Sequence, residues 1–158
     1  MSRLRTASGE PFATGEAPWE ARFALANDRL TRLFVQVEVE GQPTSAVVDT
    51  GGAYFILNPA IAAKLPLERS PVVYRDRLLI RGMSCWGTVH RVPVTLLAAE
   101  GESLTFEATA FVPELEYGET WPLPSYLGWQ GCLDRIRFAV DPADEVVYFG
   151  AVEADHRE

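Results

Sequence analysis

The order of apolar and polar residues along the chain predicts a protein built mostly of short β-strands. Residues 33–40 (LFVQVEVE) alternate apolar and polar side chains, which is the period of a strand buried on one face. Further strand-like runs follow at residues 44–48, 53–57, 72–81, 88–98, 104–112, 138–140 and 146–149. We therefore expect a mostly β fold with a closed, barrel-like sheet.

One or two short helices and a long hairpin are expected among these strands. Asn58 followed by Pro59 is typical of a helix N-cap with proline at the first helical position, and this helix should end at Leu65. A second short helix is predicted over residues 129–137. Residues 82–87 are predicted to form the tip of a hairpin between strands 72–81 and 88–98, with a glycine on each side of the tip.

The length of the chain, 158 residues, is that of a single domain. Residues 1–21 are rich in Gly, Pro, Ala, Ser and Glu and show no hydrophobic period, so we expect a mobile N-terminal arm. The folded domain is expected to span residues 22–150, followed by a C-terminal tail at residues 151–158.

Composition narrows the classes of partner. The formal net charge is −8 and no basic cluster is present, which argues against a nucleic-acid partner. No apolar run is long enough to span a membrane, and no apolar segment follows the first charges as in a secretory signal. Cys85 and Cys132 lack metal-type spacing, so we expect reduced thiols in a cytoplasmic protein, with a single disulfide as the alternative. No metal and no cofactor are predicted.

The segment at residues 46–52 (AVVDTGG) carries the candidate chemistry. Small apolar residues lead into Asp49, and Thr50, Gly51 and Gly52 follow, as in a buried strand that ends in a tight glycine-containing loop. The structural alternative is a strand followed by a simple Asx turn. Hydrolysis of a peptide bond by carboxylates takes two acids that share one proton, and the chain has only one such motif.

Three motifs resemble single-domain, retropepsin-like aspartic proteases of bacteria, which are related to retroviral proteases. The motifs are Val47–Gly51, the hairpin at Gly82–Gly87 and residues 126–133 (YLGWQGCL), and the resemblance covers about residues 30–150. It implies a retropepsin (acid protease) fold, in which Leu127 and Gly128 support the catalytic loop. Family members with one motif act as homodimers, with one Asp from each subunit.

The resemblance also implies roles for individual residues. Asp49 would be the catalytic acid, Thr50 would form a hydrogen bond across the dimer, and Gly51 would shape the loop. The substrate, a peptide or protein, would contact the catalytic loop and a flap: Gly52, Ala53, Gly82, Met83, Ser84, Cys85, Trp86 and Gly87.

Two positions depart from the family pattern and leave a second function open. The family usually has Ala or Ser where this chain has Gly52, and glycine-rich sequence where it has Met83–Trp86. The alternative function is a peptide-binding or dimerisation module of the same fold that does not catalyse hydrolysis.

Overall fold

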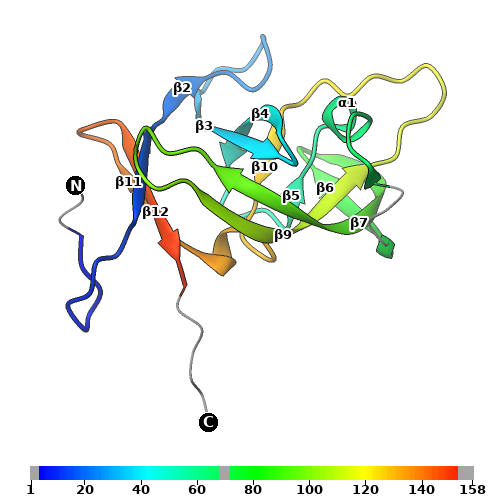
Figure 1. Cartoon of the computed structure of the whole chain (residues 1–158). Helices are drawn as coiled ribbons and strands as arrows, with labels where there is room; N and C mark the ends of the chain where they lie inside the picture. Colours follow the sequence, from blue (N-terminus) through cyan, green and yellow to red (C-terminus); the bar gives the residue numbers. More distant parts are fainter. Residues whose placement is uncertain (1–3, 68–71, 153–158) are drawn as a thin grey trace.

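Strands dominate the computed structural model of the chain, which describes residues 4–67 and 72–152 (Figure 1). The strands, in chain order, are β1 (Gly15–Pro18), β2 (Glu20–Arg22), β3 (Arg32–Val39), β4 (Gln42–Val48), β5 (Phe55–Ile56), β6 (Val72–Ile80), β7 (Met83–Leu96), β8 (Glu100–Gly101), β9 (Leu104–Pro113), β10 (Ser125–Leu127), β11 (Ile136–Asp141) and β12 (Val146–Ala151). The helical elements are α1 (Pro59–Ala62) and the 3-10 turn η2 (Leu133–Arg135). The expected mostly β fold is confirmed.

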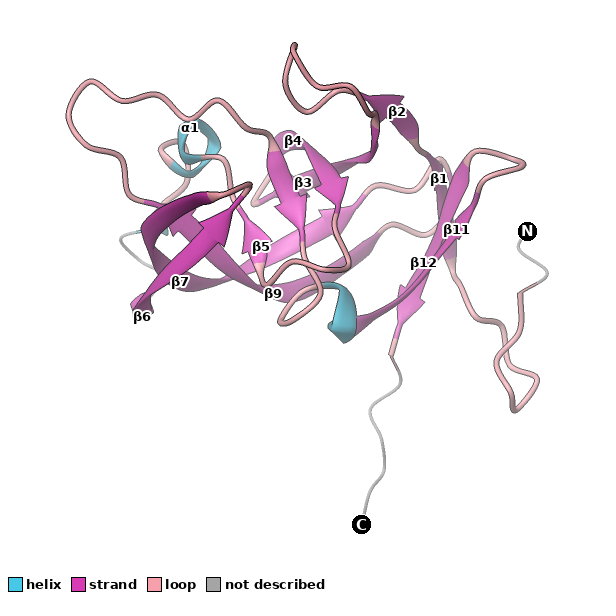
Figure 2. Cartoon of the chain, turned by 180° about the vertical axis from the view of Figure 1, so that it is seen from behind, coloured by secondary structure: helices cyan, strands magenta, loops and turns pink. Residues whose placement is uncertain are grey.

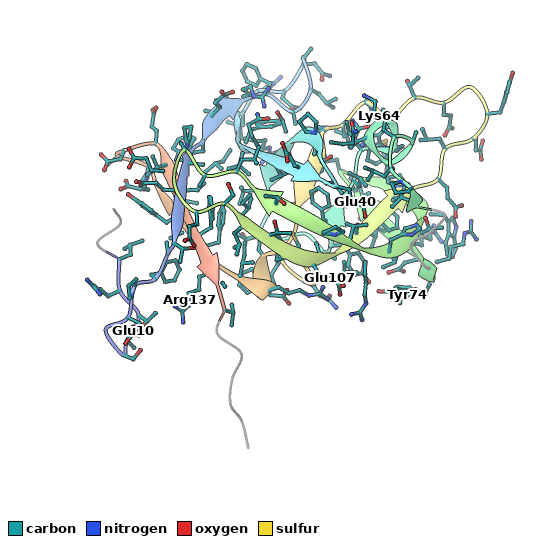
Figure 3. All side chains as sticks on the ribbon, viewed as in Figure 1. Glu10, Glu40, Lys64, Tyr74, Glu107 and Arg137 are labelled. Atoms are coloured by element: carbon teal, nitrogen blue, oxygen red, sulfur yellow. The ribbon has the colours of Figure 1, made fainter. Side chains whose placement is uncertain are left out.

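The main sheet has eight strands and closes on itself. Its order is β2-β3-β4-β10-β5-β9-β7-β6, and an additional pairing of β3 with β7 joins the two sides into a ring. The buried apolar residues of these strands, such as Val37, Phe55, Val92 and Leu127, fill the interior. Charged side chains such as Glu40, Lys64 and Glu107 are exposed (Figure 3).

A second, four-stranded sheet has the order β11-β12-β1-β8 and lies at the opposite end of the molecule from the β6–β7 hairpin (Figure 2). The mobile arm expected at residues 1–21 is therefore wrong for its C-terminal part, because β1 pairs with β12 and β8, and β2 pairs with β3. The partners of β1 lie far away in sequence and β2 has only three residues, so no local period signals either strand. Residues 1–3 of that arm, and 153–158 of the expected tail, lie outside the described residues.

The first predicted helix is present but ends at Ala62 instead of Leu65, and the second is absent. Asn58 caps α1 by accepting a hydrogen bond from the backbone N–H of Ala60 (2.9 Å), as its sequence predicts. The helix predicted over residues 129–137 is wrong: only η2 is helical, and β11 begins at Ile136. The N–H of Trp129 and the carbonyl oxygen of Gln130 bond to residues 52 and 54 instead of to a helical turn.

The tip of the β6–β7 hairpin is shorter than the sequence predicts. Arg81 and Gly82 form a two-residue turn with φ of 48° and 80°, as in a type I′ turn. Residues 83–87 are not the tip but the start of β7, paired with residues 76–80 of β6. Gly87 has a packing role, because a Cβ there would lie 2.3 Å from the ring of Phe111.

Among the described residues, none of the helices has the length and apolar character needed to cross a lipid bilayer.

Candidate active site

Asp49 lies where two parallel strands of the main sheet end side by side. It directly follows β4, and β4 pairs in parallel with β10, placing Val48 opposite Leu127. The Asp49 N–H donates to the Leu127 carbonyl oxygen at 2.9 Å. Val47 and Leu127 are buried, so the apolar run before Asp49 anchors the loop in the core.

The turn after Asp49 brings backbone groups to its carboxylate. The N–H of Gly51 donates to Asp49 Oδ1 at 3.2 Å. A Cβ at Gly52 would lie 2.8 Å from Asp49 Oδ2, so the carboxylate occupies the space that a side chain at Gly52 would take. Thr50 is exposed at this turn. The loop therefore holds the carboxylate close to its own backbone.

A second loop, residues 127–130, braces the turn. The N–H of Trp129 donates to the carbonyl oxygen of Gly52 (2.7 Å), and that of Gly128 to the carbonyl oxygen of Tyr54 (2.9 Å). A Cβ at Gly128 would lie only 2.3 Å from the same carbonyl oxygen, so this close approach needs glycine. Leu127 and Gly128 thus contact the Asp49 loop through backbone hydrogen bonds.

A cavity of about 180 Å³ opens beside Asp49. Gly51, Gly52 and Ala53 line one side, and the end of β6 with the hairpin tip lines the other; the remaining lining residues are Ile56, Leu78, Leu79, Ile80, Arg81 and Tyr126. Asp49 is the only carboxylate among these described lining residues. A one-chain site therefore holds one of the two acids that carboxylate hydrolysis needs.

The hairpin does wall the cavity, but through residues that sequence reasoning missed. Leu78–Arg81 line it, whereas none of the residues predicted for the flap, Gly82–Gly87, does so. The signal was available, because Arg81-Gly82 between two strand-like runs is a suitable two-residue turn, which would have moved the tip toward β6.

An ion pair ties the hairpin tip to the segment before β3. The Arg81 guanidinium donates to both carboxylate oxygens of Asp28, at 2.7 and 3.0 Å. Asp28 also accepts the N–H of Leu25, and its side chain is only 9% exposed. The hydrogen bond from Arg81, aided by that N–H, lowers the pKa of Asp28 to about 2, so the pair is charged at any ordinary pH.

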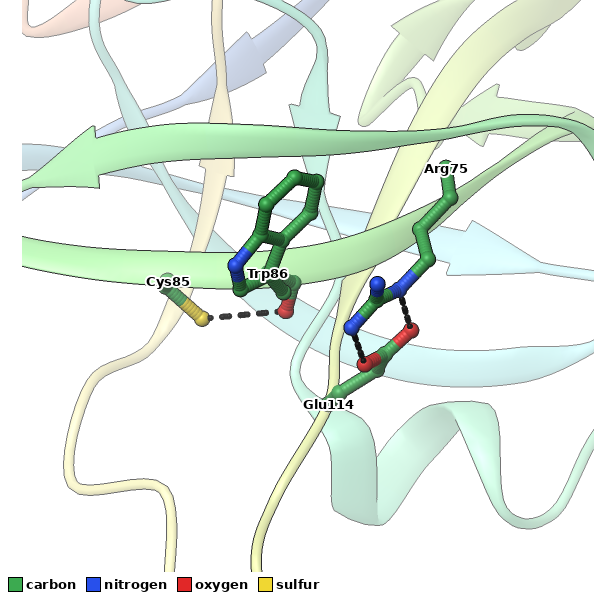
Figure 4. Close-up of polar contacts among 4 residues, drawn as sticks. All are labelled: Arg75, Cys85, Trp86 and Glu114. Atoms are coloured by element: carbon green, nitrogen blue, oxygen red, sulfur yellow. Dashed lines mark hydrogen bonds and ion pairs between the residues drawn. The ribbon is translucent and has the colours of Figure 1, made fainter.

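Met83, Ser84, Cys85 and Trp86 line a different cavity, between the start of β7 and the loop after β9. The Cys85 thiol donates to the Trp86 carbonyl oxygen at 3.3 Å (Figure 4). Burial raises the pKa of the Cys85 thiol, and nearby Glu114 and Glu119 raise it further. Cys85 is therefore protonated and weakly nucleophilic at neutral pH.

Among the residues that the structure describes, no group of three or more His, Cys, Asp and Glu side chains is placed to hold a metal ion.

Comparison with known proteins shows what the sequence around these loops is similar to. Residues 35–112, which include the Asp49 loop and the β6–β7 hairpin, match the model of the aspartyl protease family. The structure of a retropepsin-like aspartic protease from Rickettsia conorii is 17% identical, with a TM-score of 0.46 over 86% of this chain and 99% of that chain. The retroviral protease-like domain of Ddi1 from Leishmania major is 22% identical, with a TM-score of 0.48 over 80% and 99%. No curated protein matches the sequence.

Proposed function

Because residues 35–112 match the model of the aspartyl protease family, we propose that the chain is an aspartic endopeptidase of the retropepsin-like kind, whose active site forms from two copies of the chain. The observation that carries this proposal is the Asp49 cavity. One carboxylate stands at the end of a buried strand, in a glycine-containing loop, beneath a hairpin. The two-fold axis of a homodimer would bring a second Asp49 to the same water molecule.

The proposed reaction uses the two carboxylates as an acid and a base. Two like charges a few ångströms apart do not both ionise, so the pair of Asp49 side chains holds one proton. The ionised carboxylate takes a proton from the water as the water oxygen attacks the peptide carbonyl carbon. The protonated carboxyl donates its proton to the peptide carbonyl oxygen. The tetrahedral intermediate then collapses, the C–N bond breaks and the amine leaves with a proton.

The surrounding residues have supporting roles in this proposal. The N–H of Gly51 donates to the Asp49 carboxylate and helps to orient it. Thr50, exposed beside Asp49, is available for a hydrogen bond to the second subunit. Leu78–Arg81 cover the cavity, and Gly52 and Ala53 line it, so these residues would contact the substrate backbone and limit the access of water.

The second candidate is a peptide-binding module of the same fold without turnover. Gly52 favours it, because Gly52 offers no side-chain hydroxyl to the Asp49 carboxylate that lies over it. A two-carboxylate site without that donor depends on backbone N–H groups alone.

Replacement of Asp49 tests the proposal. In a peptide-library cleavage assay between about pH 4 and 7, Asp49→Asn should lower the cleavage rate at least about a thousandfold, because it removes the acid and the base together. Asp144→Asn, in the exposed turn before β12, is the matched control and should leave the rate unchanged.

Inhibition of the wild-type cleavage by a statine-type peptide would support the endopeptidase. Tight peptide binding by the wild-type protein without any cleavage would instead support the module. Undiminished cleavage by Asp49→Asn would contradict the proposed mechanism.

A further inference from the structure

A cavity of about 620 Å³ lies apart from the Asp49 cavity and shares no lining residue with it. Residues 83–86 of β7, with Arg75 of β6, form one wall, and residues of the loop 114–122 form the other. We infer that this cavity, called here the β7 groove, binds an extended, positively charged peptide segment that adds to β7 as a strand. The inference does not depend on chemistry at Asp49.

The first observation is a free strand edge. The pairing of β7 with β9 stops at Gly87 and Pro113, so residues 83–86 extend beyond β9. The two-residue turn makes Ile80 of β6 and Met83 of β7 a hydrogen-bonded pair. Hydrogen-bonded and non-hydrogen-bonded pairs alternate along an antiparallel ladder. The backbone groups of Ser84 and Trp86 therefore point away from β6, toward the groove.

One backbone acceptor of this edge already has a partner. The carbonyl oxygen of Trp86 accepts the N–H of Glu114 at 2.8 Å, where the chain leaves β9. Among the described residues, no backbone partner occupies the N–H and C=O of Ser84 or the N–H of Trp86 on the groove side. Such an edge is the template used when an extended peptide adds a strand to a sheet.

The second observation is the aromatic character of the walls. The guanidinium of Arg75 lies over the ring of Trp86, 4.4 Å from the ring centroid. Arg75 also donates two 2.8 Å hydrogen bonds to the Glu114 carboxylate (Figure 4). These contacts join the two walls at one end of the groove. Across the groove, the buried Nε1–H of Trp121 has no hydrogen-bond partner among the described residues. A peptide carbonyl that reached this donor after a small rotation of the ring would satisfy it.

The third observation is the charge of the groove, which selects the occupant. Arg75 neutralises Glu114, but Glu116 and Glu119 line the same groove without a cationic partner among its lining residues. The net charge of the lining is therefore negative, and Lys or Arg side chains complement it. A second copy of this chain is disfavoured as the occupant, because the acidic lining favours a cationic segment and the sequence contains no cluster of Lys and Arg.

The test uses the Asp49→Asn protein, so that no cleavage disturbs the measurement of binding. The probe is a fluorescein-labelled peptide of nine alternating Lys and Val residues, titrated by fluorescence anisotropy at two salt concentrations. The matched control peptide has Glu in place of Lys. Binding of the Lys peptide should weaken with salt, and the Glu peptide should bind at least about tenfold more weakly.

Paired substitutions separate the strand edge from the side chain. Ser84→Pro removes the N–H on the groove side, and Ser84→Ala removes the same hydroxyl but keeps that N–H. Relative to Asp49→Asn alone, Ser84→Ala should bind within about twofold, and Ser84→Pro at least about fivefold more weakly. Replacing both Glu116 and Glu119 by Gln should weaken binding about threefold and reduce its salt dependence.

Chemical shifts provide the readout that holds even where Ser84→Pro does not fold. The Lys peptide should move the amide signals of Ser84 and Trp86 and the indole N–H signal of Trp121. Equal binding by Ser84→Pro and Ser84→Ala, equal binding of the Lys and Glu peptides, or shifts confined to Gly51 and Gly52 would each overturn the inference. Concentration-dependent shifts at Ser84 without any peptide would also overturn it, because a second copy would then be the occupant.

Discussion

At the scale of single residues, two glycines beside Asp49 differ in what a side chain would meet. A Cβ at Gly52 would lie 2.8 Å from Oδ2 of Asp49, the free end of a side chain that can turn away. A Cβ at Gly128 would lie 2.3 Å from the carbonyl oxygen of Tyr54, which is part of the backbone. The first contact acts on the position of the carboxylate, and the second acts on the fold.

The two alanine substitutions should therefore separate activity from stability. Gly52→Ala should change the free energy of unfolding by less than about 0.5 kcal/mol but should change the rate of peptide cleavage measurably, because the carboxylate must move. Gly128→Ala should lower the free energy of unfolding by about 2 kcal/mol or more, because two backbone segments must separate. Urea unfolding and cleavage rates measure the two effects. Unchanged cleavage by Gly52→Ala would show that the position of Asp49 is not critical.

At the scale of elements, the β6–β7 hairpin lines the Asp49 cavity with the end of β6 and the turn residue Arg81. The ion pair of Arg81 with Asp28 holds the hairpin tip. Arg81 has a positive φ at the turn and reaches Asp28, which precedes β3. The hairpin is therefore tied to its own subunit. Substrate entry would then involve opening of a lid that carries a charged anchor.

The tether has a defined pH dependence. The pKa of Asp28 is lowered from 3.8 to about 2 in the folded chain, so its contribution to stability is complete above about pH 4 and is lost as the pH falls through about 2. Asp28→Asn should lower the urea midpoint relative to the wild type at pH 7 and at pH 5 by the same amount. The difference should shrink below about pH 4. A constant difference down to pH 2 would contradict the ion pair as its cause.

At the scale of the whole molecule, the decisive feature is that the described residues of one chain provide one carboxylate to the cavity. The smaller sheet, β11-β12-β1-β8, is assembled within one chain at the end opposite the hairpin (Figure 1). The loops around Asp49, with exposed Thr50 and Trp129, lie beside the carboxylate that the proposed two-fold contact must bring to its counterpart.

Activity should therefore depend on assembly. On dilution, the cleavage rate per chain should fall as dimers dissociate, and sedimentation should show the loss of dimer over the same concentration range. Excess Asp49→Asn protein should inhibit the wild type by subunit exchange, because a mixed dimer holds only one of the two acids. As a control, the double variant Asp49→Asn, Asp144→Asn should inhibit the wild type to the same extent as Asp49→Asn alone. A constant rate per chain for a sedimenting monomer would contradict the proposed dimer.

Much of the fold was predictable where the determining interactions are local. The alternation at residues 33–40 predicted β3, and Asn58-Pro59 predicted the start of α1. The apolar run before Asp49 predicted a buried strand ending at a candidate acid. Elements without a local pattern were missed. The partners of β1 are distant, β2 has only three residues, and the segment after Gly128 bonds to the Asp49 loop instead of forming a helix.

The sequence by itself determined the mostly β class and the candidate acid, because strand alternation and a glycine loop after a buried strand are written in neighbouring residues. Only the tertiary structure decided which residues surround that acid. Leu78–Arg81 line the Asp49 cavity, residues 83–86 line a separate groove, and Arg81 pairs with Asp28. These arrangements follow from the turn at Arg81-Gly82 and from backbone hydrogen bonds between segments far apart in the chain, which no local pattern records.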